Sequence, residues 1–136
     1  MNKKFSILLA VLALIASTLA CAAGEPTLSN VRTARDAAGD ELASVFSTND
    51  TIYVVSDLTN GKQGNVVTSK WMVDNVEGYE SGFLIDEVDI KLDEDKLAYT
   101  INFYFEPPTE GWPVGSYKVE VYFNEVLNST VTFSVE

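Results

Sequence analysis

The sequence predicts an all-β fold, a single antiparallel β-sandwich, for the part of the chain that follows residue 27. Apolar residues there recur mostly at every second position, the spacing that places side chains on one face of a β-strand. They are mainly β-branched and aromatic, which favours strands over helices. The apolar segments are short and are separated by turn residues, as in sandwiches and barrels. Because the other face of each segment is polar, a parallel sheet covered on both sides is excluded.

We expect about seven strands. They are Leu28 to Ala34, Thr51 to Leu58, Asn65 to Val73, Phe83 to Leu92, Leu97 to Phe105, Tyr117 to Phe123, and a last strand lined by Val131, Phe133 and Val135. Asn60-Gly61 and Asn124-Glu125 are turn dipeptides, and each is expected to connect two strands. Only residues 35–45 offer a short helix, and Gly39 argues against it.

The alternation predicts which side chains of each strand face inward. The inward residues are Ile52, Val54 and Leu58 in the second strand; Val67, Trp71 and Val73 in the third; Leu97, Tyr99, Ile101, Phe103 and Phe105 in the fifth; and Tyr117, Val119, Val121 and Phe123 in the sixth. The fourth strand changes phase, because Phe83 and Ile85 alternate before Val88, Ile90 and Leu92 take over. Such a change predicts a β-bulge or a crossing between sheets.

The first residues form a targeting segment. Lys3 and Lys4 precede an apolar run of 15 residues, Phe5 to Leu19. This run is typical of a signal peptide and is shorter than the roughly 20 residues that span a bilayer as a helix. We therefore expect residues 1–20 to be a signal peptide, 21–27 a short tether, and 28–136 the folded domain.

Cys21 is the only cysteine, so no disulfide within the chain is possible. The sequence Thr18-Leu19-Ala20-Cys21 resembles the lipobox of bacterial lipoproteins, although Thr18 stands where an aliphatic residue is usual. The resemblance implies that Cys21 is lipidated, becomes the new N-terminus and anchors the chain to a membrane. The alternative is ordinary secretion, because Ala20-Cys21-Ala22 also fits a cleavage site.

Cleavage before Cys21 would leave 116 residues, which is enough for one domain with its own core. Seven basic residues would then stand against 20 acidic ones, a net charge of −13. A charge of this sign repels nucleic acid, so we expect no nucleic-acid partner.

Two features resemble immunoglobulin-like β-sandwich domains. Trp71 stands in the middle of the third strand, where such domains place a core tryptophan. The sequence from Gly115 to Val121 resembles the Gly-x-Tyr-x-Val-x-Val strand of bacterial immunoglobulin-like modules. The opening Leu28 to Arg32 and the segment Trp112 to Tyr117 also look like those of uncharacterised bacterial envelope lipoproteins, which implies no particular activity.

The residues needed for catalysis are scarce. The chain has no histidine, which removes the commonest general base and metal ligand. Ser69 and Lys70 are neighbours in a strand and so face opposite ways. Asp93 and Asp95 could supply oxygens to Ca²⁺, but without a calcium-loop pattern a solvated turn is the favoured interpretation. We expect no enzyme, no cofactor and no metal.

Trp112, flanked by prolines, and Tyr79, flanked by glycines, are the candidate ligand contacts. An exposed Trp112 ring would be a stacking platform for a sugar or peptide. The favoured alternative is that Trp112 folds back as a plug over the end of the sandwich.

Together these features predict a lipid-anchored protein on the extracytoplasmic side of the cell membrane or outer membrane. The expected role is a non-catalytic binding or structural module that engages another envelope protein or polymer. The alternative is a small-ligand or carbohydrate receptor that uses Trp112 and Tyr79.

Overall fold

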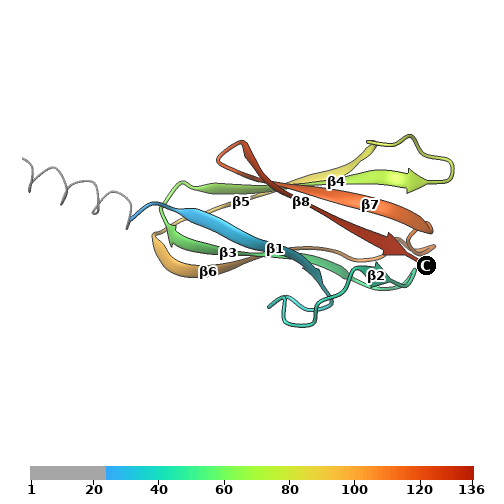
Figure 1. Ribbon diagram of the computed structural model, residues 1–136, viewed down its shortest axis with the longest axis horizontal. Helices are drawn as coiled ribbons and strands as arrows, with labels where there is room; N and C mark the ends of the chain where they lie inside the picture. The colour runs from blue at the N-terminus through green and yellow to red at the C-terminus, as the bar shows by residue number, and fades with distance from the viewer. Residues whose placement is uncertain (1–23) are drawn as a thin grey trace, which may run out of the picture.

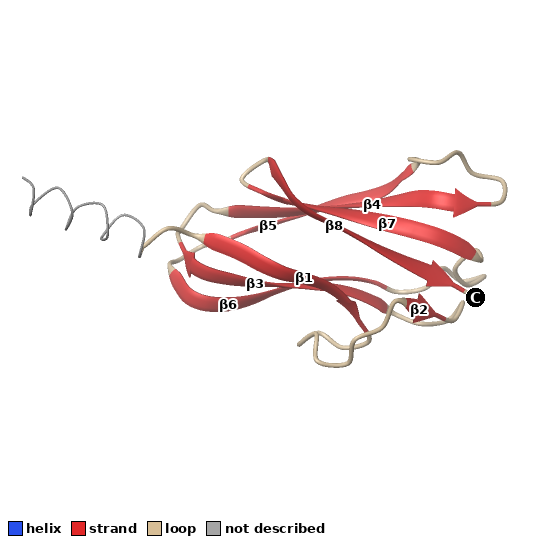
Figure 2. Cartoon of the chain, viewed as in Figure 1, coloured by secondary structure: helices blue, strands red, loops and turns tan. Residues whose placement is uncertain are grey.

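The strands of residues 24–136, the part of the chain that the computed structural model describes, form two β-sheets packed face to face (Figures 1 and 2). The bounds are β1 (Thr27–Ala34), β2 (Val45–Phe46), β3 (Ile52–Gly61), β4 (Val66–Val76), β5 (Leu84–Lys91), β6 (Lys96–Phe105), β7 (Gly115–Phe123) and β8 (Val126–Val135). The predicted signal peptide and Cys21 lie outside the described residues.

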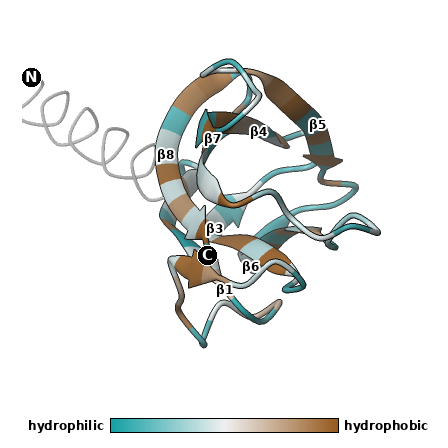
Figure 3. Ribbon diagram, turned by 90° about the vertical axis from the view of Figure 1, so that its right-hand side faces the viewer, coloured by the Kyte–Doolittle hydropathy of each residue, from teal (hydrophilic) through white to brown (hydrophobic). Residues whose placement is uncertain are grey.

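One sheet has three strands in the order β1-β3-β6, and the other has five in the order β2-β8-β7-β4-β5. All neighbours are antiparallel except β2 and β8, which are parallel. The end view shows the two layers, with β4, β5, β7 and β8 above β1, β3 and β6 (Figure 3). The predicted all-β fold, a β-sandwich, is confirmed. The two-residue β2 adds an eighth strand next to the segment where a short helix was considered.

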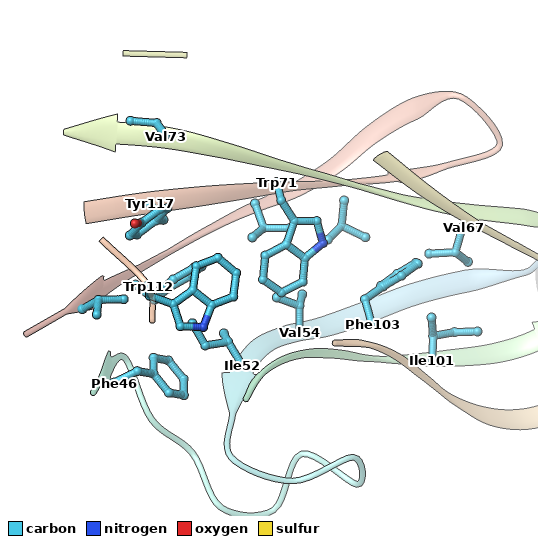
Figure 4. Close-up of a cluster of buried hydrophobic side chains, with 14 of the residues drawn as sticks. Phe46, Ile52, Val54, Val67, Trp71, Val73, Ile101, Phe103, Trp112 and Tyr117 are labelled. Carbon is cyan, nitrogen blue, oxygen red and sulfur yellow. The ribbon is translucent and has the colours of Figure 1, made fainter. Parts of the chain in front are cut away.

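The core lies between the sheets and is centred on Trp71 of β4 (Figure 4). Its ring lies 4.5 Å from the ring of Phe105 and 6.0 Å from that of Phe133, measured between centroids. The indole nitrogen donates a hydrogen bond of 3.0 Å to Ser69, which is also buried. This bond satisfies a polar group that would be costly to bury alone.

A tyrosine corner closes the turn before β7, as in many immunoglobulin-like domains. The Tyr117 hydroxyl donates a 2.5 Å hydrogen bond to the carbonyl of Pro113, four residues upstream. Its ring stacks on Phe133 at 5.1 Å. Burial, with a smaller contribution from Tyr79, raises the pKa of Tyr117 above its ordinary value. Gly115 begins the strand with φ +148°, and a Cβ there would lie 2.4 Å from the Asn75 carbonyl, so the motif requires glycine.

The predicted bulge is present in β5. Trp71 pairs with Asp86 and the next residue, Met72, pairs with Leu84, so Ile85 is the extra residue. This insertion produces the phase change seen in the sequence.

One predicted turn is confirmed and one is wrong. Asn124 and Glu125 turn between β7 and β8 with φ of 47° and 70°, as a two-residue hairpin requires. By contrast, β3 continues through Asn60 and Gly61, and the turn falls at Lys62 to Asn65. The Asn65 side chain accepts a 2.7 Å hydrogen bond from the Lys62 amide, which holds this later turn.

The predicted inward face of β6 is only partly correct. Ile101 and Phe103 are buried, but Leu97 is 85% exposed and Tyr99 is 42% exposed. Both lie in the first half of an edge strand. Tyr99 borders Ile90 and Lys91 of β5 but is not enclosed by the facing sheet, and Leu97 is almost fully exposed. Alternation shows which side chains share a face, whereas burial also requires an opposing layer.

Candidate functional site

Trp112 closes one end of the sandwich as a plug. The side chain is 6% exposed and lies among Phe46, Ile52 and Tyr117 (Figure 4). Its ring nitrogen donates a 2.9 Å hydrogen bond to the Asp50 carbonyl, and its amide donates one of 2.8 Å to the Thr48 carbonyl. The structure therefore favours the plug over the stacking platform, because the ring has almost no free surface.

An ion pair fixes the loop that accepts these hydrogen bonds. The Arg35 guanidinium lies 2.7 Å from the Asp50 carboxylate and also donates to the Val45 carbonyl at 2.8 Å. The Ser47 amide donates to the same carboxylate at 2.8 Å. The Ser47 amide and, second, Arg35 hold the pKa of Asp50 below its ordinary value. In this network the charged groups of Arg35 and Asp50 bond to each other and to backbone groups, which stabilises the closed end.

Tyr79, the second candidate, lies in an apolar cleft at the same end of the molecule. We call it the distal cleft, because it lies at the end opposite to the start of the described chain (Figure 1). Its volume is about 230 Å³. The lining residues are all apolar or aromatic: Val73, Val76, Tyr79, Phe83, Leu84, Ile85, Pro113 and Tyr117.

The loop between β4 and β5 shapes this cleft. Gly78 and Gly82 both have positive φ, which allows the chain to turn twice within a few residues. The Gly82 amide donates to the Val73 carbonyl at 2.7 Å, and the Val73 amide donates to the Phe83 carbonyl at 2.9 Å. These bonds hold the loop in place while Tyr79 and Phe83 remain 50% and 52% exposed, with their rings 5.8 Å apart.

The loop at the rim of the distal cleft is acidic. It carries Glu77 and Glu80, which form no ion pair with any described residue. Residues 72–90, which contain this loop, include no lysine or arginine, and the nearest basic residue along β7 is Lys118, which follows the lining residue Tyr117. The rim formed by this loop is therefore negatively charged.

The chemistry available in the cleft is binding. Its only polar side-chain atoms are the two tyrosine hydroxyls, and that of Tyr117 already donates to Pro113. Elsewhere, Asp95 accepts a 2.8 Å hydrogen bond from the Gln63 amide, and Glu94 pairs with Lys96 at 2.8 Å. Within residues 24–136 no group of three acidic or sulfur ligands is placed to hold a metal ion. The described residues also include no helix long and apolar enough to cross a membrane.

The sequence singled out Tyr79 but not its neighbours in the cleft. The sequence predicts that Phe83, Leu84 and Ile85 belong to a strand, yet three consecutive apolar residues cannot share one face. That break in the alternation was the available signal for an exposed apolar surface.

Comparisons with known proteins define the fold and no family. No family model matches the chain, and no curated protein matches it. A similar solved structure is the alkylpurine DNA glycosylase AlkC of Pseudomonas fluorescens bound to DNA, with TM-score 0.50 and 12% identity over 83% of this chain and 31% of that one. Another is the GH3 beta-glucosidase of Bifidobacterium adolescentis, with TM-score 0.51 and 14% identity over 82% of this chain and 17% of that one. The chain thus spans less than a third of either protein, and the likeness concerns the fold alone.

Proposed function

We propose that this chain is a lipid-anchored extracytoplasmic lipoprotein whose sandwich is a non-catalytic binding module, and that the distal cleft is its binding surface. The observation that carries the second part is the exposure of Tyr79, Phe83, Leu84 and Ile85 around one cleft. Clustered apolar side chains at a surface are typical of interaction sites.

The size of the cleft favours a side chain of a protein partner. Sites for small molecules usually enclose about 300–1,000 Å³, and the distal cleft is smaller, at about 230 Å³. A sugar receptor based on Trp112 and Tyr79 gains little support, because Trp112 is buried. Of these two residues, only Tyr79 has an exposed ring.

The charge favours a partner segment with basic residues. Glu77 and Glu80 lack ionic partners in residues 24–136, and the net charge of the whole chain is −11. Lysine or arginine beside an inserted apolar side chain would be attracted to this rim. We therefore propose that the partner presents an aromatic or aliphatic side chain between basic residues.

The position of the cleft agrees with an N-terminal anchor. The described chain starts at one end of the sandwich and the β4–β5 loop lies at the other (Figure 1). Lipidation at Cys21, three residues before Gly24, would hold the first end near the membrane and direct the cleft away from it.

Peptide titration followed by amide chemical shifts tests the cleft. The probes are Lys-Lys-Phe-Lys-Lys, its glutamate-flanked analogue, and Lys-Lys-Ala-Lys-Lys, all with blocked ends. We expect only the first to shift amides of residues 76–85, and Phe83→Ser to abolish the effect. The matched control is Val126→Ser, which changes an exposed apolar residue of the β7–β8 hairpin. Equal binding of the glutamate-flanked peptide would refute the charge argument, and shifts elsewhere or none would refute the cleft.

Metabolic labelling with a palmitate analogue tests the anchor. The wild-type chain should be labelled and recovered with membranes, whereas Cys21→Ser should be neither. Labelling of the mutant, or a secreted unlabelled wild type, would contradict the lipoprotein proposal while leaving the cleft untouched.

A further inference from the structure

The four sheet edges of this sandwich are protected to different degrees. Exposed edges usually carry charges, bulges or prolines, or are very short, which prevents pairing with another chain. Here β2 has two residues, β1 has a register shift between Ser29 and Arg32, and β5 carries Asp86, Glu87 and Asp89. The fourth edge, β6, has none of these features from Leu97 to Phe105.

The outer edge of β6 is also long and regular. It pairs with β3 without an interruption in register from Lys96 to Phe105, and no strand within residues 24–136 pairs with its other side. On the inner face of the same strand, Leu97 and Tyr99 remain exposed. This edge therefore combines free backbone groups with uncovered apolar side chains.

We propose that β6 pairs with β6 of a second copy of this chain, antiparallel and symmetric about Ile101. The pairing joins two three-stranded sheets into one of six strands. Opposed residues would be Lys96 with Glu106, Leu97 with Phe105, Ala98 with Tyr104, Tyr99 with Phe103, Thr100 with Asn102, and Ile101 with its own copy. The exposed side chains of Leu97 and Tyr99 would each gain an aromatic neighbour on the same face, Phe105 and Phe103 respectively.

The charges favour this register over its neighbours. Lys96 and Glu106 are the only charged residues in the paired stretch, and they oppose each other twice. Lys96 would add Glu106 of the second copy to its existing pair with Glu94. A shift of two residues in one direction would place Glu94 opposite Glu106. A shift in the other direction would leave Lys96 opposite Pro108, and a one-residue shift would turn the apolar face outward. Pro107 and Pro108 end the pairing, since they cannot donate to the ladder.

The net charge of the chain sets the conditions under which the pair forms. Two acidic copies repel each other, and salt screens this repulsion. We therefore expect association to strengthen as salt rises, despite the weakening of the Lys96–Glu106 pairs. The antiparallel arrangement also places the two amino ends at opposite ends of the pair, so copies anchored on facing surfaces could meet in this way.

Sedimentation equilibrium of residues 24–136 tests the proposal, because both sheets and the whole buried cluster lie within this fragment. We expect a concentration-dependent dimer. Lys96→Glu or Glu106→Lys alone should weaken it by roughly fivefold, because like charges replace two exposed ion pairs. The double variant should restore it. The matched control Lys118→Glu, on β7, makes the same charge change away from this edge and should leave dimerisation near wild type.

Thermal unfolding of each variant checks that the fold is intact, and we expect only small changes at these half-buried and exposed surface positions. A fragment that stays monomeric up to its solubility limit overturns the proposal. If the single variants weaken the dimer and the double variant does not restore it, the proposed register is wrong. Neither result affects the distal cleft, which lies on other strands.

Discussion

Large apolar side chains are buried at the closed end of the sandwich and exposed at the beginning of β6. At the closed end, Trp112 is covered on its faces, and both of its N–H groups donate hydrogen bonds. At the start of β6, Leu97 and Tyr99 have the inward alternation of a core strand and remain exposed. The two regions differ in what lies opposite them, because loops fold over Trp112 and no strand of the other sheet covers Leu97.

The comparison separates residues that stabilise the fold from residues that are free to bind. Removing a covered side chain loses its contacts and leaves a cavity. An uncovered side chain has few contacts to lose, so changing it should affect association more than stability. The predictions below follow this difference from the largest expected effect to the smallest.

Trp71→Ala should lower the free energy of unfolding by about 3–5 kcal/mol, because it removes the largest side chain at the centre of the core. Urea unfolding followed by circular dichroism measures this. Since a domain is stable by only about 5–15 kcal/mol in total, the variant should be partly unfolded on mild heating. A loss below about 1 kcal/mol would mean that the ring is not enclosed as described.

Trp112→Ala should cost about 3 kcal/mol, at the lower end of the range for buried tryptophan, because the end loops can partly close over the gap. The same urea titration measures it, and Trp112→Phe, which keeps much of the apolar contact but loses the hydrogen bond to Asp50, should cost less. If Trp112→Ala were neutral, Trp112 would not be a plug, and the stacking-platform alternative would return.

Asp50→Asn should cost about 1 kcal/mol or less at neutral pH, because the pair with Arg35 is partly exposed to solvent. The pKa of Asp50 is lowered in the folded state, so its stabilisation is complete above the ordinary carboxyl range and is lost as pH falls through the folded pKa. Thermal melts from pH 7 to pH 2 should show the difference from wild type shrinking below about pH 4. Glu125→Gln, in the exposed hairpin turn, is the control for the change in net charge. A difference that stayed constant with pH would contradict the role of the carboxylate.

Leu97→Ser should change the unfolding free energy by no more than about 0.5 kcal/mol in dilute solution, because the side chain is almost fully exposed. Comparison of its urea midpoint with that of Trp112→Ala tests the contrast between the two regions directly. A loss approaching that of Trp112→Ala would show that another part of the chain covers β6.

The sequence alone predicted the fold class and most of the buried core residues. Alternation identified Val67, Trp71 and Val119 as buried. The phase change in the fourth strand predicted a bulge or a crossing between sheets, and the structure has a bulge at Ile85. Alternation and a change in its phase are properties of one strand's own sequence, so they can be recognised without knowing its neighbours. The exposure of Leu97 depends on which strand lies opposite, a long-range property that alternation does not contain.

The candidate site shows the same division. Tyr79 is notable in the sequence because Gly78 directly precedes it and Gly82 lies three residues after it, but the cleft around it needs β4, β5 and Pro113 to come together. The Trp112 plug required the position of the Asp50 carbonyl, 62 residues away in sequence. Neither arrangement could be read from one segment alone.

Site-resolved hydrogen exchange at two protein concentrations tests most directly whether the uncovered edge is an interaction surface. The Trp112 amide, bonded to the Thr48 carbonyl, should exchange slowly at both concentrations. The amides of β6 that point away from β3 should exchange quickly in dilute solution and more slowly in concentrated solution. If exchange along β6 is the same at both concentrations, the edge does not associate with a second copy, and the exposed residues of this strand have no such role.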